Sequence, residues 1–307
     1  MSAHSIGHVS TLVVDSARND RALGLDVWYP TDATAGDFAS YELLPGIALP
    51  STKALNTPPP TSRNLPLVVW SHGRTGLRQN YSQLCESLAG NGFIVAVPDH
   101  PGDTLIDWLT GKNVDDQTNE IQRLGDISFT IDQLVTPNAE SLLPEFAIDT
   151  NRIYVAGHSY GGLTAIISST GMHGVQPDQR VRAIAGAQAY TRTLPDDLIR
   201  RITVPTLLLV GSGDVTTPPS SDADPIWSVL STLNPRNRRV DLPNGGHQAC
   251  SDFSLYMEVV PTIPGIPQMV LDYLDSIAAE SPAGFRDTWR DTMSVQVDNL
   301  VEFFATN

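Results

Sequence analysis

The sequence predicts an α/β fold with a mostly parallel central sheet and helices on both faces. From residue 65 onward, short apolar segments with strand character alternate with segments of helical periodicity. The apolar segments are hydrophobic at nearly every position, which is typical of parallel strands that are buried on both faces. A chain of 307 residues is long enough to bury a large core without disulfides or metal ions. We expect residues 1–307 to form a single domain.

A different pattern precedes residue 65. Residues 10–15 and 22–29 have strand character on either side of a polar turn, which predicts an N-terminal antiparallel hairpin. Residues 30–66 are rich in Pro, Thr, Ala and Ser, and they include consecutive prolines at 58–60. Because proline and small polar residues interrupt regular structure, we expect an irregular, Pro-rich excursion over the surface there.

The repeating part of the chain supplies the expected sheet and its covering helices. Strands are expected at residues 65–70, 93–97, 152–156, 181–187, 205–210 and 239–242. Helices are expected at residues 80–89, 121–134, 161–169 and 289–304. Residues 103–125 are a candidate for a small cap over the functional site.

Composition limits the partners and the compartment. With 19 basic and 34 acidic residues the net charge is -15, which argues against nucleic acid as a partner because phosphate backbones are repelled. No apolar run approaches the roughly 20 residues of a membrane span, and the start shows no signal peptide, so we expect a cytoplasmic protein. Cys85 and Cys250 are too few for a disulfide framework, and both a single bridge and two free thiols stay open.

Residues 157–161 read G-H-S-Y-G, which matches the pattern G-x-S-x-G. An apolar strand precedes this segment and a helical segment follows it, the setting typical of the nucleophile elbow of the α/β-hydrolase fold. Glycines two residues before and after Ser159 leave room for strand and helix to approach each other. We expect Ser159 to be a nucleophile. The alternative is a Gly-rich turn of a Rossmann-like fold in which Ser159 only caps the helix.

A serine nucleophile needs a base, and the base needs an orienting acid. In this fold the three follow in the order serine, acid, histidine. After Ser159 the chain contains only His173 and His247. His173 directly follows the expected elbow helix, whereas His247 lies in a Gly-rich loop near the C-terminus from which it can reach the elbow. We expect His247 to be the base; the alternative is a solvated loop imidazole.

For the acid, Asp214 comes just beyond the carboxyl end of the expected strand at 205–210. Open α/β sheets place their sites at this edge. Asp222 and Asp224 lie further into the following loop, and Asp241 ends the next strand, so we expect these three to be surface acids or helix caps. Asp214 is the predicted acid.

The oxyanion hole is expected at the loop after the strand at 65–70, where residues 71–76 read S-H-G-R-T-G. The backbone N–H groups of Arg74 and Tyr160 are the predicted donors. His72 is expected to brace this loop. The side chain of Arg74 either anchors an acidic substrate or points to solvent, and both interpretations stay open.

Four motifs together resemble a known group of enzymes. Residues 71–73, 98–102, 157–162 and 246–248 are similar to the bacterial "predicted dienelactone hydrolase" group. That group is related to platelet-activating-factor acetylhydrolases and, more distantly, to cutinase-like polyester hydrolases. The similarity covers roughly residues 65–253. It implies ester hydrolysis through an acyl-enzyme, with no metal or organic cofactor, and it carries the roles above to Ser159, His247, Arg74 and Tyr160.

The chain departs from this group at two positions. True dienelactone hydrolases use a cysteine nucleophile, whereas the elbow here holds Ser159, which puts that substrate in doubt. The acetylhydrolases place their acid after the strand that corresponds to residues 181–187. Here residues 187–189 read A-Q-A without a carboxylate, which returns the role to Asp214.

The predicted function is therefore hydrolysis of a carboxylic ester of a small molecule. The same triad could cleave an amide or peptide bond, and a non-catalytic ligand-binding protein could keep the same scaffold. Leu105 and Trp108, in the candidate cap, are expected to line an apolar acyl pocket; the alternative is that they form the buried side of an ordinary surface helix. The oligomeric state stays open.

Overall fold

The computed structural model describes residues 4–44, 46–61, 63–136, 144–279 and 281–307. Within these residues, ten strands form one sheet in the order β10-β9-β8-β7-β5-β6-β2-β1-β4-β3. The strands are β1 (Ser5–Asp15), β2 (Arg21–Thr31), β3 (Phe38–Leu44), β4 (Ile47–Asn56), β5 (Leu65–Ser71), β6 (Ile94–Pro98), β7 (Ile148–His158), β8 (Val181–Ala187), β9 (Thr206–Gly211) and β10 (Arg238–Leu242).

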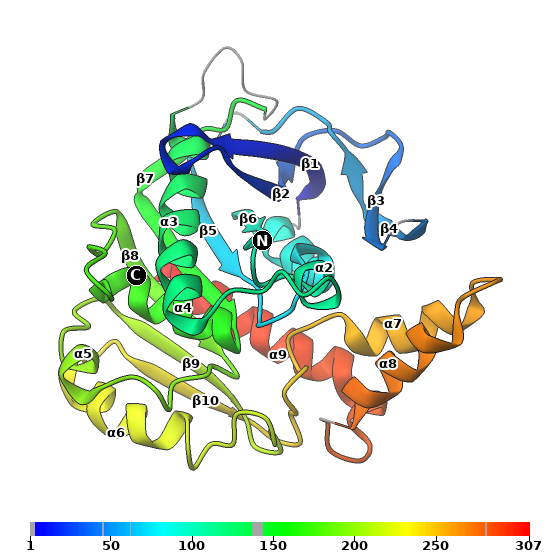
Figure 1. Cartoon of the computed structure of the whole chain (residues 1–307). Helices are drawn as coiled ribbons and strands as arrows, with labels where there is room; N and C mark the ends of the chain where they lie inside the picture. The colour runs from blue at the N-terminus through cyan, green and yellow to red at the C-terminus, as the bar shows by residue number, and fades with distance from the viewer. Residues whose placement is uncertain (1–3, 45, 62, 137–143, 280) are drawn as a thin grey trace.

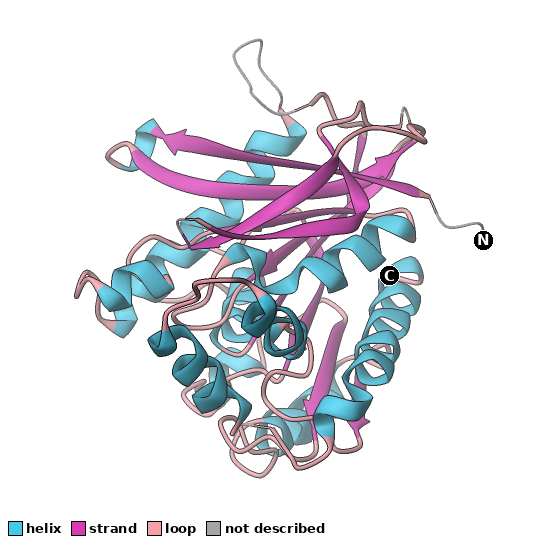
Figure 2. Ribbon diagram, turned by 90° about the vertical axis from the view of Figure 1, so that its right-hand side faces the viewer, coloured by secondary structure: helices cyan, strands magenta, loops and turns pink. Residues whose placement is uncertain are grey.

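Helices connect and cover the strands (Figures 1 and 2). They are α1 (Ser82–Gly90), α2 (Leu105–Leu109), α3 (Asp116–Val135), α4 (Tyr160–Thr170), α5 (Asp196–Ile199), α6 (Ala223–Leu233), α7 (Phe253–Val259), α8 (Gln268–Ala278) and α9 (Phe285–Ala305). The six strands from β10 to β6 in the sheet all run parallel to their neighbours.

Side chains of each parallel strand alternate between two cores, as the geometry of a strand requires. Leu67 and Val69 of β5 belong to the core that includes residues of α3, α4 and α6, whereas Val68 and Trp70 belong to the core that includes residues of α1 and α9. All four side chains are completely buried, which explains why these strands are apolar at every position. The predicted α/β architecture, with helices on both faces of a mostly parallel sheet, is confirmed.

The N-terminal hairpin is also confirmed. β1 pairs antiparallel with β2 along its whole length, from Ser5 opposite Thr31 to Asp15 opposite Arg21. β2 then joins the hairpin to the parallel part of the sheet by antiparallel pairing with β6.

The prediction that residues 30–66 are irregular is wrong. They contain β3 and β4, which extend the sheet, because β4 pairs parallel with β1 and β3 pairs antiparallel with β4. β4 contains Pro50, and a proline argues against a strand when only the sequence is considered. The structure tolerates this proline because β1 pairs only with residues 54–56 of β4, so Pro50 lies where the ladder with β1 has ended.

Helices α7 and α8 were not predicted from the sequence. They lie side by side at one end of the molecule, near the β3–β4 hairpin (Figure 1). Leu49 of β4, Tyr256 of α7 and Leu274 of α8 share a small core that is separate from the two cores of the central sheet. Residues 103–125, the candidate cap, contain α2 and the first half of α3, and their role as a cap stays a prediction.

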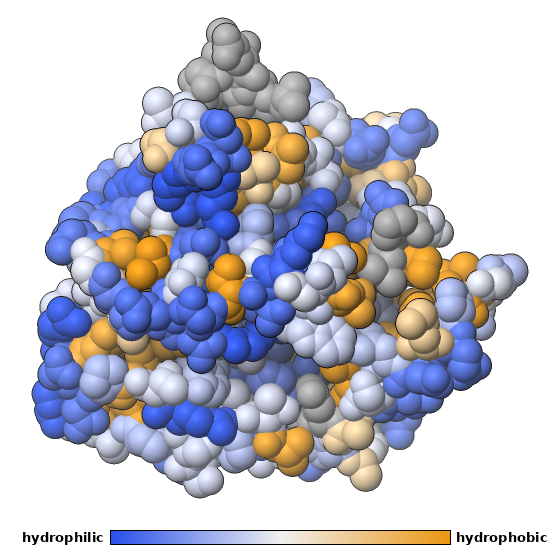
Figure 3. All heavy atoms as spheres, in the orientation of Figure 1, coloured by the Kyte–Doolittle hydropathy of each residue, from blue (hydrophilic) through white to orange (hydrophobic). Residues whose placement is uncertain are grey.

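The surface agrees with the acidic composition. Hydrophilic side chains dominate the face in Figure 3, and apolar side chains form small separate groups there. Among the described residues, no helix is long and apolar enough to cross a membrane. Cys85 and Cys250 are free thiols, both buried.

Candidate active site

Ser159 stands at a sharp turn between β7 and α4. Its backbone angles are φ 54° and ψ −118°, a strained conformation that a non-glycine residue rarely adopts. The turn is possible because the neighbouring glycines allow very close contacts. A Cβ atom on Gly161 would lie 1.9 Å from the backbone oxygen of Ser71, and one on Gly157 would lie 2.3 Å from the backbone oxygen of Gly161. The strand–turn–helix setting predicted for the G-x-S-x-G segment is therefore present.

The structure brings the three predicted triad residues together from separate loops. Nε2 of His247, in the loop after β10, lies 3.0 Å from Oγ of Ser159. Nδ1 of His247 lies 2.9 Å from Oδ2 of Asp214, which follows β9. A carboxylate only accepts hydrogen bonds, so the proton of the neutral imidazole is on Nδ1 and the Nε2 lone pair faces the serine hydroxyl.

Asp214 is held as a carboxylate by its surroundings. Burial alone raises the pKa of Asp214, but hydrogen bonds from His247 and Thr217 outweigh this effect and keep the pKa below its usual value. The backbone N–H groups of Thr216 and Thr217 donate to Oδ1 over 2.9 and 2.8 Å. The hydroxyl of Thr217 lies 2.7 Å from Asp214 Oδ2 and 3.2 Å from His247 Nδ1. This residue was not identified from the sequence. A threonine shortly after an aspartate at a turn is the available signal.

Of the three other acids near the C-terminal edge, Asp224 and Asp241 are exposed, as expected of surface acids. The expectation is wrong for Asp222, which is buried and whose side chain makes no cap hydrogen bond. Asp222 pairs with Arg192, and Asp224 and Asp241 both pair with Arg239. They leave Asp214 as the carboxylate in contact with the imidazole of the candidate base.

The second histidine after the elbow serves a different contact. His173 lies in the turn after α4, and its Nε2 lies 2.5 Å from Oε2 of Glu120 on α3. Oε1 of the same carboxylate accepts a hydrogen bond of 2.8 Å from the hydroxyl of Tyr160. His173 therefore contacts the same carboxylate that binds the hydroxyl of Tyr160.

One buried side chain holds the predicted oxyanion loop in place through hydrogen bonds. Arg123 of α3 donates to Oγ of Ser71 and to the backbone oxygens of His72 and Gly73 over 3.1, 2.8 and 3.4 Å. Its charge is matched by Asp103 at 2.7 Å. Arg123 was not identified from the sequence, because an arginine in a helical segment has no local mark of burial.

The predicted brace, His72, and one predicted donor, Arg74, belong to this loop, whereas the other donor, Tyr160, begins α4. Nε2 of His72 accepts a hydrogen bond from the backbone N–H of His100 over 3.1 Å, and Nδ1 lies 2.7 Å from the oxygen of Gly73. Burial holds the pKa of His72 well below its usual value, so the ring braces the loop in its neutral form. The backbone N–H groups of Arg74 and Tyr160 have no hydrogen-bond acceptor within the described part of the chain.

Both interpretations of the Arg74 side chain stay open, because it is 44% exposed and Arg74 also lines the cavity in front of Ser159. Its guanidinium pairs with Asp116 at 2.5 Å and lies over the ring of Tyr160, 4.3 Å from the centroid. Arg74 therefore connects the oxyanion loop, the first turn of α3 and the residue after the nucleophile.

A cavity of about 240 Å³ opens in front of Ser159. α7 and α8 supply its apolar wall through Phe253, Tyr273 and Ile277. The prediction that Leu105 and Trp108 line this pocket is wrong. Neither residue is part of its described lining, and the side chain of Trp108 on α2 is 53% exposed.

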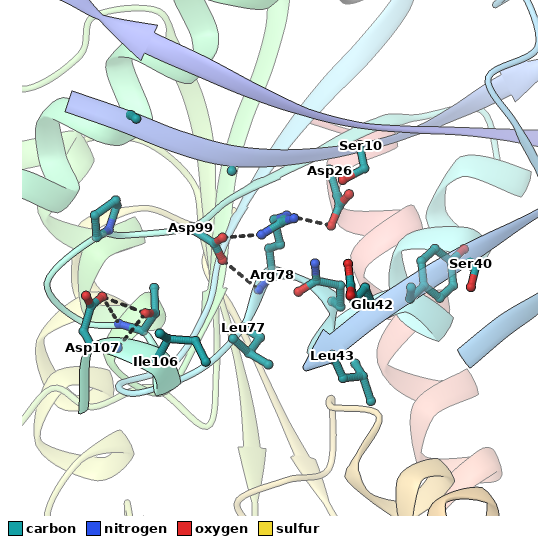
Figure 4. A pocket seen from close by; sticks show the side chains of 16 residues that line it. Ser10, Asp26, Ser40, Glu42, Leu43, Leu77, Arg78, Asp99, Ile106 and Asp107 are labelled. Carbon is teal, nitrogen blue, oxygen red and sulfur yellow. Dashed lines mark hydrogen bonds and ion pairs between the residues drawn. The ribbon is translucent and has the colours of Figure 1, made fainter. Parts of the chain in front are cut away.

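A larger cavity, about 680 Å³, is lined in part by the segment that follows the predicted oxyanion loop, including Leu77 and Arg78 (Figure 4). Its described lining contains none of the three triad candidates. Arg78 crosses its wall between Asp99 and Asp26, with Nε 2.9 Å from Oδ2 of Asp26. This ion pair anchors the segment after the oxyanion loop to β2 and to the end of β6.

Beneath the loop lies a second serine–histidine–aspartate arrangement. Oγ of Ser71 lies 2.9 Å from Nε2 of His100, whose Nδ1 lies 3.0 Å from Oδ2 of Asp126. All three residues are completely buried, so no substrate can reach them. The Asp126 carboxylate can only accept, so the proton of the neutral His100 ring is on Nδ1 and Nε2 accepts a hydrogen bond from the Ser71 hydroxyl. The same hydroxyl oxygen accepts from Arg123, and complete burial makes the arrangement structural.

Comparisons with known proteins agree with this architecture. Residues 18–133 match the family described as "Platelet-activating factor acetylhydrolase, isoform II". A platelet-activating factor acetylhydrolase of Canis lupus familiaris is 28% identical over 188 residues, which cover 49% of this chain and 40% of that protein. The solved structure of a ferulic acid esterase from Streptomyces cinnamoneus superposes with a TM-score of 0.72 at 22% identity, covering 99% of this chain and 89% of that chain.

These matches confirm the α/β-hydrolase fold and the resemblance to the acetylhydrolases. The chain matches less than half the length of the dog enzyme. The family match also ends before the elbow at Ser159, so it covers the oxyanion loop but not the three triad candidates.

The elbow predicts a sharp difference between two glycines. We expect Gly161→Ala to destabilise the fold by more than about 3 kcal/mol, because the added methyl meets backbone that has no room to move. Gly90→Ala is the control, since its Cβ would lie 3.8 Å from the nearest atom at the end of α1. Urea unfolding measures both free energies of unfolding. Equal stabilities would contradict the packing described for the elbow.

Burial of His100 predicts acid lability. Its pKa is lowered from 6.5 to about 4, mainly by burial and also by the charge of Arg123. The unfolded chain takes up this proton near pH 6.5 and the folded chain does not, so stability is complete above pH 6.5 and is lost as the pH falls towards 4. Between about pH 7.5 and about pH 5 this loss is about 2 kcal/mol.

Urea unfolding of the wild type and of His100→Gln at both pH values isolates this contribution. The variant should lose about 2 kcal/mol less than the wild type over this interval, whatever its stability at the higher pH. The same pH dependence in both proteins would show that His100 does not stay neutral in the fold.

Proposed function

We propose that this protein is a serine hydrolase that cleaves a carboxylic ester of a small molecule through an acyl-enzyme. The observation that supports it best is the hydrogen-bonded chain from Ser159 Oγ through His247 to the Asp214 carboxylate, with distances of 3.0 and 2.9 Å. The strained elbow presents this serine at a cavity, next to two backbone N–H groups without acceptors in the described residues.

In the first step, Ser159 Oγ attacks the ester carbonyl while His247 Nε2 takes its proton. The imidazolium that forms is stabilised by the Asp214 carboxylate, and the carbonyl oxygen becomes an oxyanion that accepts hydrogen bonds from the N–H groups of Arg74 and Tyr160. When this intermediate collapses, His247 gives its proton to the leaving alcohol oxygen and the acyl-enzyme remains.

In the second step, water replaces the alcohol. His247 Nε2 takes a proton from the water molecule, whose oxygen attacks the acyl carbon of the Ser159 ester. Collapse of the second oxyanion returns the proton to Ser159 Oγ and releases the carboxylic acid. The chemistry needs only these side chains and backbone groups, and no metal ion or organic cofactor takes part.

An ester is favoured over an amide by the similar proteins, since one is named an acetylhydrolase and another a ferulic acid esterase. The same triad could hydrolyse an amide, and matched ester and amide substrates decide between the two. A cavity of about 240 Å³ with an aromatic wall suits a compact substrate group. A purely ligand-binding role would leave the alignment of Ser159, His247 and Asp214 without a purpose.

Removal of the nucleophile tests the proposal directly. We expect Ser159→Ala to lower kcat on short-chain esters by at least about 10⁴-fold, and to abolish labelling by a fluorophosphonate. Ser228→Ala is the control, because this exposed hydroxyl on α6 donates to the carbonyl of Pro225 and belongs to no contact of the candidate site. Near-normal activity or labelling of Ser159→Ala would exclude the assigned nucleophile.

The predicted acid, Asp214, is tested by replacing one carboxylate oxygen with an amide nitrogen. Asp214→Asn should lower kcat by about 10⁴-fold, because an amide can donate to Nδ1 of His247 and force the proton onto Nε2. Asp241→Asn, an exposed acid that pairs with Arg239, should leave kcat unchanged. Ester hydrolysis by both purified variants gives the comparison. If Asp214→Asn keeps wild-type kcat, another group must orient the base.

A further inference from the structure

His158, the residue before the nucleophile, belongs to a buried hydrogen-bond chain that joins three loops. Its Nε2 lies 2.7 Å from the backbone oxygen of His247, and its Nδ1 lies 3.0 Å from the hydroxyl of Tyr81. The same hydroxyl lies 3.0 Å from the backbone nitrogen of Gly73 in the oxyanion loop. His158, Tyr81 and His247 are 3%, 2% and 4% exposed, so water does not compete for these contacts.

The two end groups of this hydrogen-bond chain determine the position of every proton in it. The backbone N–H of Gly73 can only donate, so the oxygen of Tyr81 accepts there. The backbone carbonyl of His247 can only accept, so Nε2 of His158 must carry a proton. Nδ1 of a neutral His158 is then an acceptor, and the tyrosine proton points at it.

The chain requires a neutral His158, and the surroundings provide it. The pKa of His158 is lowered to about 3, first by burial and then by the charge of His247, against which the hydrogen bond to the His247 carbonyl and the charge of Asp214 act only weakly. Burial raises the pKa of Tyr81 well above its usual value, so the phenol keeps its proton. A neutral ring beside His247 also avoids repulsion when the base becomes an imidazolium; the two ring centroids are 4.7 Å apart.

We propose that His158 is a positioning residue that fixes the backbone of the base loop and the backbone of the oxyanion loop to the elbow. The hydrogen bond to the His247 carbonyl sets where the imidazole of the base stands relative to Ser159. The hydrogen bond from Gly73 to Tyr81 sets the position of Gly73 relative to the elbow, and Gly73 precedes the predicted donor Arg74. This inference rests on the proposed function, because it concerns the same reaction.

A simpler alternative is that His158 and Tyr81 only fill space. Both are large rings in a dense region, and a Cβ on Gly73 would lie 3.2 Å from Nδ1 of His158. Packing and hydrogen bonding predict different results when a hydroxyl is removed and the ring is kept. Tyr81→Phe makes this change.

We expect Tyr81→Phe to lower kcat on an ester substrate by about 10- to 100-fold while KM changes by less than about threefold, because the reacting groups lose alignment but the cavity keeps its lining. Tyr154→Phe is the matched control. Tyr154 is a buried tyrosine of β7 whose hydroxyl has no hydrogen-bond partner in the described residues, so kcat should not change. Wild-type kcat in Tyr81→Phe would overturn the proposal.

Two substitutions of His158 test the other half of the chain. A glutamine amide can donate to the His247 carbonyl from nearly the position of Nε2, whereas leucine cannot donate at all. His158→Gln should keep kcat within about tenfold of the wild type, and His158→Leu should fall well below it. Equal kcat values for the two variants would overturn the proposal in favour of packing.

A measurement that does not depend on catalysis separates this inference from the proposed function. The ¹⁵N chemical shifts of His158 in the wild-type protein should show a neutral ring protonated on Nε2 from about pH 8 to about pH 5. A ring protonated on Nδ1, or charged at about pH 6, would exclude the hydrogen-bond chain even if Ser159 is the nucleophile. Conversely, failure of the wild type to hydrolyse any ester would overturn the proposed function and the positioning role, while the shifts still report on the chain itself.

Discussion

The guanidinium of Arg123 lies fully buried between α3 and the loop after β5, where it donates to Ser71, His72 and Gly73. It also lies 5.3 Å from the ring centroid of Tyr160. A buried cation that loses its partners is costly, so this side chain can remain inside only while the loop keeps its carbonyl oxygens turned towards it. The constraint acts on both predicted oxyanion donors, since one follows Gly73 and the other belongs to Tyr160.

Further polar contacts continue this constraint outward. Asp103 neutralises Arg123, and Asn119 on the same helix donates to Asp103 over 2.6 Å. Arg21 forms a two-fold hydrogen bond with Asp126, the carboxylate that also receives His100. Such a network tolerates no missing partner, because each unsatisfied group would keep its desolvation penalty. The loop beside Ser159 is thus set in place before any substrate binds, which is what electrostatic stabilisation of an oxyanion requires.

How much of the fold and of the candidate site the sequence predicts depends on whether each feature is defined by neighbouring residues or by residues far apart in the chain. The elbow is local, because five consecutive residues and their flanking periodicity define it. Asp214 and His247 were identified through chain order and strand ends, which depend only on topology. The contacts of Arg123 and the contact of Thr217 with His247 depend on which segments meet in space, and no periodicity reports this. β4 was missed because it contains Pro50 and because its alternation of buried and exposed residues breaks at residues 52–53. β3 was missed with it, since it lies in the same Pro-rich region and pairs only with β4 among the described strands.

The parts that sequence patterns did not predict are also those that shape the cavity. The wall formed by Phe253, Tyr273 and Ile277 belongs to α7 and α8, whose small core includes Leu49 of β4 and is separate from the cores of the central sheet. Changes in this core can move the wall without disturbing the buried network under the oxyanion loop. This wall therefore depends on contacts other than those of Arg123, whereas Arg74, Tyr81 and His158 line another part of the same cavity. Under the proposed function, variation in α7 and α8 would reshape the wall of the cavity beside Ser159 and so change which esters fit, while Arg123 keeps the neighbouring loop in place.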